Sequence, residues 1–154
     1  MNKIWGRMGL VAAAGGVAAM IAGAAVAGGH LPHEKRVKAM KELGGHMGAI
    51  GKVAKGEMAY SAETVTHAEA LEAASKVLLE WFPEGSMGGD DSRAKAEIWT
   101  DWDGFKKAAM DFEAAAPGLV AAAKTGDRGQ IGAALGAVGK TCGGCHKPYR
   151  KPKS

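Results

Sequence analysis

The residues best suited to chemistry stand together near the end of the 154-residue chain, at Cys142-Gly143-Gly144-Cys145-His146. In a helix, positions i, i+3 and i+4 share one face, so both thiols and the imidazole can address one flat object. Cys-x-x-Cys-His is the attachment signature of c-type haem, in which two thioethers anchor the macrocycle and the adjacent imidazole reaches the iron. The chain contains two cysteines and the pattern uses both, so we predict one covalently bound haem c.

Three other interpretations of the two cysteines compete with haem attachment. A disulfide between them would close a very small loop and add little stability. A thioredoxin-like redox pair is typical of a βαβ context, which this sequence lacks. A zinc site would need a further ligand from among the histidines, and none falls at a paired metal-ligand spacing; the candidates are His30, His33, His46 and His67. We expect His46 and His67 to point outward as ordinary polar residues.

The elements that must position these residues are helices, because four stretches carry apolar stripes of helical period. The stripes run over residues 36–54, 65–82, 105–123 and 131–149. No stretch alternates with period two over a useful length, so strands are not expected. Four amphipathic helices with mostly short connections predict an all-α fold, an antiparallel four-helix bundle with the haem near its C-terminus.

Helix boundaries are indicated by capping residues. Ser61 is the expected N-cap of the second helix, Gly126 the C-cap of the third, and Asp127 the N-cap of the fourth. Pro117 lies inside the third stretch, where it should kink the helix or remove a hydrogen bond near Glu113.

The N-terminal segment differs from the rest of the chain. Lys3 and Arg7 precede an uncharged run from Met8 to Gly29, which is typical of a signal peptide. We expect cleavage between Ala27 and Gly28, so that residues 1–27 form the signal peptide, residues 28–154 form the bundle domain, and the protein is periplasmic. A membrane anchor is the alternative, but a segment composed mainly of alanine and glycine gains little from lipid.

Composition and charge exclude several other classes. With 47% hydrophobic and 23% charged residues, the chain is not expected to be disordered, and two cysteines exclude a disulfide-rich scaffold. Processing would change the formal charge from +4 to +2, and basic residues gather in the tail beside the last histidine, at Lys147, Arg150, Lys151 and Lys153. A nucleic-acid partner is not expected, because positive charge does not spread along a face with aromatic residues among it.

Beyond the five residues Cys142–His146, here called the pentad, the chain resembles the class II c-type cytochromes, the family of cytochrome c′ and cytochrome c-556. The resemblance covers nearly all of the expected mature chain. It is carried by six short segments, some inside the expected helices and some between them: residues 36–40, 43–50, 82–86, 97–99, 138–141 and 149–150.

This resemblance implies roles for individual residues. Cys142 and Cys145 would hold the haem, His146 would be the axial ligand of the iron, and Arg36 would lie near a haem propionate. Phe82 would be an aromatic residue that packs at the haem pocket. Arg150 would be a basic residue close to the axial histidine. For both arginines the alternative is a solvated surface charge, and for the phenylalanine it is a plain core aromatic.

Met40 decides the iron chemistry, because it matches the position on the other side of the haem. An apolar, non-ligating side chain there leaves five-coordinate iron, as in cytochrome c′, whereas a ligating methionine gives the low-spin cytochrome c-556 arrangement with Met40 as sixth ligand. The Arg-x-x-x-Met spacing of Arg36 and Met40 and the Gly-Gly-His run at residues 44–46 favour cytochrome c′.

The predicted function is single-electron transfer by an exported haem protein that is not an enzyme and whose five-coordinate iron binds NO or CO. Its expected partners are redox proteins, without stable membrane insertion after processing. The resemblance also implies a homodimer formed through the first two helices. The alternatives are a low-spin cytochrome c-556 serving electron transfer only and, from another class, a zinc- or thiol-bearing structural bundle.

Overall fold

The computed structural model describes residues 30–88 and 92–152, and all regular structure in this part of the chain is helical. The expected signal peptide and its cleavage site lie outside the described residues. The elements in chain order are α1 (His30–Ala54), α2 (Ala62–Val77), the 3₁₀ helix η1 (Leu78–Trp81), α3 (Glu97–Thr100), α4 (Trp102–Thr125) and α5 (Arg128–Tyr149). The predicted all-α fold is confirmed.

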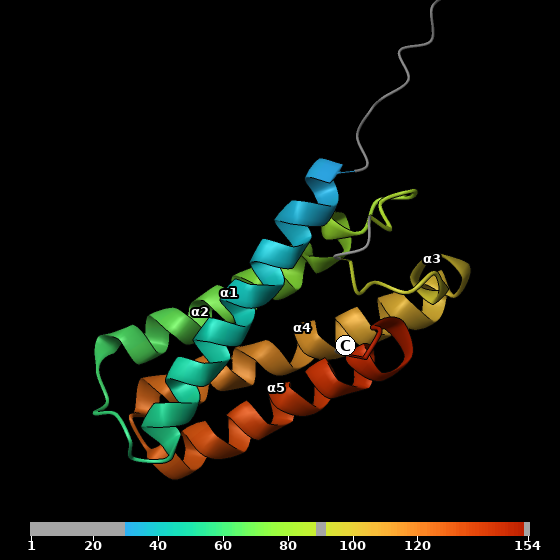
Figure 1. Cartoon of the computed structure of the whole chain (residues 1–154). Coiled ribbons are helices and arrows are strands. Elements are labelled where there is room, and N and C mark those ends of the chain that lie inside the picture. Colours follow the sequence, from blue (N-terminus) through green and yellow to red (C-terminus); the bar gives the residue numbers. More distant parts are fainter. Residues whose placement is uncertain (1–29, 89–91, 153–154) are drawn as a thin grey trace, which may run out of the picture.

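The four long helices form a closed bundle in which each packs on two others. α1 contacts α2, α2 contacts α4, α4 contacts α5, and α5 returns to α1, as Figure 1 shows. Short connections join α1 to α2 and α4 to α5, so the members of each pair run antiparallel (Figure 1). The described residues 92–101 that precede α4, which include α3, lie at the end of the bundle where α5 finishes (Figure 1).

The predicted caps define the junction between α4 and α5. Gly126 has a φ of 69°, in the left-handed region that favours glycine, and its N–H donates to the Ala123 carbonyl. Asp127 then caps α5, because its Oδ1 accepts the Gln130 N–H at 2.7 Å. Ser61 is the N-cap of α2, as predicted.

The structure differs from the predicted elements at two places. The second stripe does not stay α-helical to Phe82: it tightens into η1, and the Phe82 N–H donates to the Leu79 carbonyl at 3.1 Å. Pro83 follows Phe82, and the residue before a proline is disfavoured in helical conformation. The second difference is the short helix α3, which begins at Glu97 ahead of α4 and was not predicted.

α4 continues through Pro117 without a break. Both Pro117 and Glu113 are exposed. The proline has no N–H to donate to the Glu113 carbonyl, but on the outer side of the bundle water can satisfy that oxygen.

The core is built from the four predicted stripes and closes around an aromatic cluster. Phe105 is 1% exposed and lies edge-on to Phe82 and Tyr149, with ring centroids 4.6 and 5.3 Å away. Fully buried small residues, including Ala68 and Ala116, let the helices approach closely. The aromatic cluster is therefore the packed surface on which the last turns of α5 rest.

Candidate haem site

The Cys-x-x-Cys-His segment occupies the last two turns of α5. Cys142, Cys145 and His146 are all half-buried, and both thiols are free and pack against the hydrophobic core. Because they are three and four residues apart on one helix, they share the face that α5 turns toward the bundle. The arrangement presents two sulfur atoms and one imidazole to one side of the helix.

Burial keeps these three groups uncharged near neutral pH. It raises the pKa of the Cys142 thiol, and together with the neighbouring Cys142 it raises that of Cys145 to about 11. Burial lowers the pKa of His146, and the positive charges of Arg150 and Arg93 lower it further. A neutral imidazole keeps a lone pair on one ring nitrogen, which is what iron ligation requires.

Arg36 is buried at one end of the bundle, where only 4% of the residue is exposed. Its Nη1 donates to the Trp81 carbonyl and Ser86 Oγ, at 3.1 and 3.2 Å, and its Nη2 donates to the carbonyls of Ser86 and Met87, at 2.8 and 3.2 Å. The guanidinium also lies over the Phe82 ring, 4.8 Å from its centroid. The alternative of a solvated surface charge is therefore wrong for Arg36.

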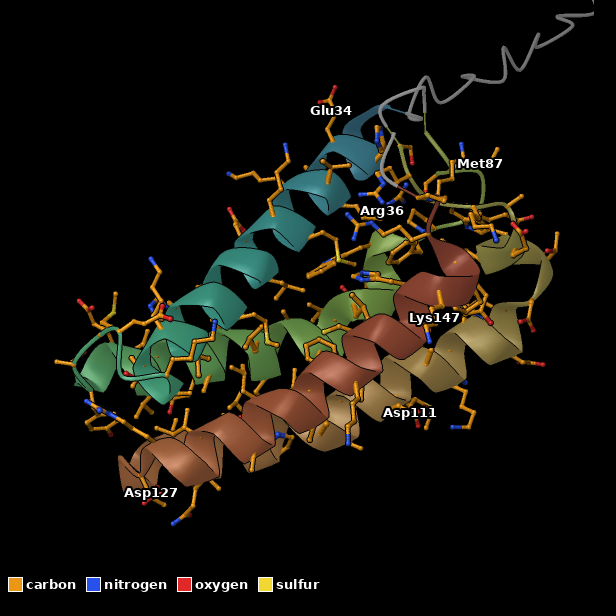
Figure 2. All side chains as sticks on the ribbon, turned by 60° about the horizontal axis from the view of Figure 1, so that its bottom comes forward. Glu34, Arg36, Met87, Asp111, Asp127 and Lys147 are labelled. Carbon is orange, nitrogen blue, oxygen red and sulfur yellow. The ribbon has the colours of Figure 1, made fainter. Side chains whose placement is uncertain are left out.

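The acceptors of Arg36 in the described part of the chain are neutral oxygens. The buried positive charge consequently favours an additional anion close by, while its burial lowers the pKa of the guanidinium. Figure 2 shows Arg36 and Met87 at the same end of the bundle as Lys147 of α5 and far from Asp127. Arg36 thus holds residues 81–87 through hydrogen bonds and places a positive charge at the end of the bundle that carries the pentad.

Met40 follows Arg36 by one helical turn, and its half-buried side chain packs against the same core cluster as Cys142 and Cys145. α1 and α5 contact each other directly. Met40 from α1 and the two cysteines from α5 therefore pack against the same hydrophobic core of the bundle.

The last two expected site residues differ in burial. Phe82 is 5% exposed and packs on Phe105, which is the environment of a core aromatic that also supports Arg36. Arg150 is exposed, and its charge acts on the neighbouring His146. The pKa of Arg150 itself is lowered by partial desolvation and by the charge of Arg93.

A group of contacts that the sequence did not reveal anchors the end of α5. Tyr149 Oη donates to Asp101 Oδ2 at 2.6 Å, and this contact with burial raises the pKa of Tyr149 to about 12. Glycine at position 104 leaves room for this pair, because a Cβ there would meet the Asp101 carboxylate and would lie 2.5 Å from Tyr149 Oη. Arg93 donates from Nε and Nη2 to the Lys151 carbonyl, at 3.0 and 2.7 Å. The only sequence signal was the place of Tyr149 on the fourth stripe.

His46 and His67 do not point outward, contrary to the prediction. Both are half-buried, and their Nδ1 atoms lie 2.9 Å apart between α1 and α2. His33, another of the candidate zinc ligands, is fully buried on α1. In residues 30–88 and 92–152, no three His, Cys, Asp or Glu side chains come together to hold a metal ion.

The residues present fit a covalently attached, iron-containing planar group. Two adjacent thiols, an uncharged imidazole and a buried cation lie at one end of the bundle, against apolar side chains. A helical bundle with Cys-x-x-Cys-His on its last helix defines a c-type haem protein. No helix in the described part of the chain is long and apolar enough to cross a membrane.

Comparisons with known proteins agree with this class. The family described as Cytochrome C′ matches residues 32–150. Cytochrome c′ of Pararhodospirillum photometricum is 42% identical over 118 residues, which are 77% of this chain and 94% of that protein. Cytochrome c-556 of Agrobacterium tumefaciens (strain II Chrys) is 37% identical, over 78% of this chain and 97% of that protein.

Solved structures give the same result. The crystal structure of cytochrome c′ from Rubrivivax gelatinosus superposes with a TM-score of 0.71 and 36% identity, covering 78% of this chain and 94% of that one. A nitric oxide complex of a cytochrome c prime variant from Alcaligenes xylosoxidans also gives 0.71, with 34% identity over 79% of this chain and 94% of that one. The chain belongs to the cytochrome c′ family. Its cofactor is covalently attached haem c, so the alternative of a zinc- or thiol-bearing structural bundle is set aside.

Proposed function

We propose that the protein carries single electrons and binds nitric oxide or carbon monoxide at five-coordinate haem iron. The observation that carries the proposal is that Cys142 and Cys145 on α5 pack against the bundle core to which Met40 contributes from α1, with half-buried His146 on the same face of α5. The two thiols would hold the haem through thioethers, and His146 would be the axial ligand. When bound, the haem supplies a one-electron couple and an axial position for a diatomic gas.

The surrounding residues support this use of the site. Burial and nearby arginines hold His146 neutral and available to a metal. Arg36 places a buried positive charge beside the pocket aromatic Phe82, which favours a haem propionate at this end. Arg150 would act on the electrostatics of the axial histidine from the surface.

Met40 would shield the distal side as an apolar side chain without ligating the iron. Two findings favour this over the cytochrome c-556 alternative, in which Met40 is the sixth ligand. Cytochrome c′ of Pararhodospirillum photometricum is 42% identical to this chain, against 37% for cytochrome c-556 of Agrobacterium tumefaciens (strain II Chrys). Similar solved structures include nitric oxide and carbon monoxide complexes of cytochrome c prime.

The proposal extends to location and partners. The signal peptide predicted at residues 1–27 would export the chain to the periplasm, where a redox protein would exchange electrons with it. Exposed basic residues at the end of α5, Lys147, Arg150 and Lys151, would orient an acidic partner there. The protein would form a homodimer through α1 and α2, as the family resemblance implies, and sedimentation analysis measures this directly.

A visible spectrum of the oxidised and reduced protein tests the iron coordination. We expect high-spin bands and uptake of carbon monoxide by the reduced form. Met40→Ala should leave the high-spin spectrum nearly unchanged and increase the rate of carbon monoxide binding, because a distal obstacle is removed. Met47→Ala is the matched control, since it removes the same side chain two turns further along α1.

The opposite outcome supports the cytochrome c-556 alternative. It consists of a low-spin spectrum with a methionine-to-iron charge-transfer band that Met40→Ala abolishes and Met47→Ala preserves. Attachment is tested separately by haem staining after denaturing electrophoresis. Stain should remain on the unaltered chain and be lost from the double variant Cys142→Ala/Cys145→Ala.

A further inference from the structure

Two histidines contact each other outside the haem site, between α1 and α2. His46 on α1 and His67 on α2 are 21 residues apart, yet their Nδ1 atoms approach to 2.9 Å and their ring centroids to 5.1 Å. Two neutral imidazoles at this distance share one hydrogen bond, in which one ring donates its Nδ1–H and the other accepts. If that single proton is displaced, both Nδ1 atoms offer lone pairs to the same point.

The pair is separate from the haem region, because neighbouring residues of α1 face different helices. A residue's position rotates by about 100° from one to the next along a helix. Met47 approaches α5, where its Cε lies 3.9 Å from the position of a Cβ on Gly139, whereas His46 meets α2. A ligand bound by the two histidines would therefore lie between α1 and α2 rather than at α5.

We propose that His46 and His67 form a binding site for a divalent transition metal, with Cu(II) preferred. Metal–imidazole bonds of about 2.0–2.1 Å place neighbouring nitrogens about 2.8–3.0 Å apart when the bond angle is 90°, and about 3.3–3.4 Å apart at the tetrahedral angle. The observed 2.9 Å is an ordinary hydrogen-bond length, and it places the two nitrogens close enough for one metal ion to bind both without movement of the helices. Square-planar or tetragonal nitrogen sites are typical of Cu(II) and Ni(II), and Cu(II) leads the affinity order of the divalent ions.

The helices hold the two rings in place before metal arrives. His46 lies one turn before Ile50, and His67 one turn before Leu71, which are 0% and 1% exposed. Neither histidine is on a loop, so binding requires ring rotation rather than ordering of backbone. The rings are tilted by 49° to each other, and each needs to turn only until its lone pair points at the metal instead of at the other nitrogen.

The site would have two protein ligands, because no third His, Cys, Asp or Glu joins the pair among the described residues. Water would occupy the other positions, which the half-exposed setting permits. Such a site exchanges metal readily and binds more weakly than a closed one with four protein ligands.

The test must remove another copper ligand that processing is expected to create. Cleavage before Gly28 would leave Gly28-Gly29-His30 as the N-terminus, whose amine, amide and imidazole nitrogens chelate Cu(II). His30→Gln is therefore the starting protein. Copper(II) chloride is titrated into the haem-containing protein by calorimetry, and low-temperature electron paramagnetic resonance records the bound ion.

We expect one Cu(II) per chain in the His30→Gln protein, with an axial signal split by two nitrogens, and weaker binding of zinc(II) chloride. His46→Gln or His67→Gln in the same background should weaken Cu(II) binding by at least about tenfold. The matched control is Thr66→His/His67→Thr, which keeps the number of histidines but moves one imidazole about 100° around α2, and it should lose the site equally.

Three results would overturn the proposal. The first is the absence of Cu(II) binding by the His30→Gln protein, which would leave the pair as a hydrogen-bonded contact between helices. The second is undiminished binding by the control with the moved histidine. The third is zinc binding as tight as copper binding, which contradicts the proposed preference for Cu(II). Circular dichroism of each variant verifies that the helices remain folded.

Discussion

Replacing Arg36 with methionine tests whether this side chain holds residues 81–87 against the bundle. Methionine keeps an apolar stem but removes all five N–H donors of arginine. The substitution leaves the Oγ and the carbonyl oxygen of Ser86 without their Arg36 donors. Ser86 is only 3% exposed, so water does not readily replace those donors. A buried acceptor left without a partner costs about 1–3 kcal/mol.

We therefore expect Arg36→Met to lower the free energy of unfolding by about 2–6 kcal/mol, counting only the two Ser86 acceptors. The carbonyls of Trp81 and Met87 are left out because they lie in part-buried contacts where water can replace the guanidinium. Arg36→Lys should lose part of this amount, because one ammonium cannot reproduce the planar fork that reaches both sides of Ser86.

The assay is urea unfolding of the haem-containing protein, followed by circular dichroism and haem absorbance and extrapolated linearly to water. Lys38→Met is the control, since its side chain is 81% exposed and its Nζ lies 3.9 Å from Glu42; we expect a change within about 0.5 kcal/mol. A double-mutant cycle with Ser86→Ala should give a coupling energy of about 0.5 kcal/mol or more. The reasoning is refuted if Arg36→Met behaves like Lys38→Met.

Three further predictions concern the supports of α5. Gly104→Ala should destabilise the protein by about 1–3 kcal/mol, because the added methyl group meets Tyr149 Oη. Gly118→Ala is the control: its Cβ would have nothing within 4 Å, so it should stabilise the protein by about 0.5–1 kcal/mol. Thermal unfolding compares the two variants. Tyr149 keeps its proton in the folded state up to a pKa of about 12, so its contribution to stability is present below the usual tyrosine pKa and is lost as pH rises through the folded value. Tyr149→Phe should remove that alkaline dependence in unfolding curves, and an unchanged dependence would contradict the assignment. Asp127→Ala should cost about 0.5–2 kcal/mol in urea unfolding through loss of the α5 cap, while Asp127→Asn, which keeps a capping oxygen, should cost less.

Most of the helical framework was predictable because its signals are local. The stripe of α4 identifies Phe105, Phe112 and Leu119 as buried, and all three are. Gly126 and Asp127 mark the turn into α5 because a left-handed C-cap and a side-chain N-cap involve residues only a few positions apart. The short α3 carried no such signal, since four residues are too few for a periodic pattern.

The sites were predictable to different degrees. The Cys142–His146 segment was recognisable because haem attachment requires that spacing of two thiols and an imidazole. The roles of Met40 and Phe82 were predicted from the family resemblance alone. The surroundings of Arg36 were not, because whether an arginine is solvated or buried depends on what packs over it. The prediction for His46 and His67 failed for the same reason, since each position taken alone is typical of a surface residue.

The sequence by itself determined the helices, their apolar faces, their caps and the group of sulfur and nitrogen atoms near the end of α5. These depend on the helical repeat and on contacts within about one turn. Only the tertiary structure decided which side chains meet across helices. Arg36 reaches acceptors 45 to 51 residues away, Tyr149 meets Asp101 across 48 residues, and His46 meets His67 across 21. Such contacts depend on the rotation and axial position of each packed helix, which are set by the packing of the whole core rather than by any local pattern.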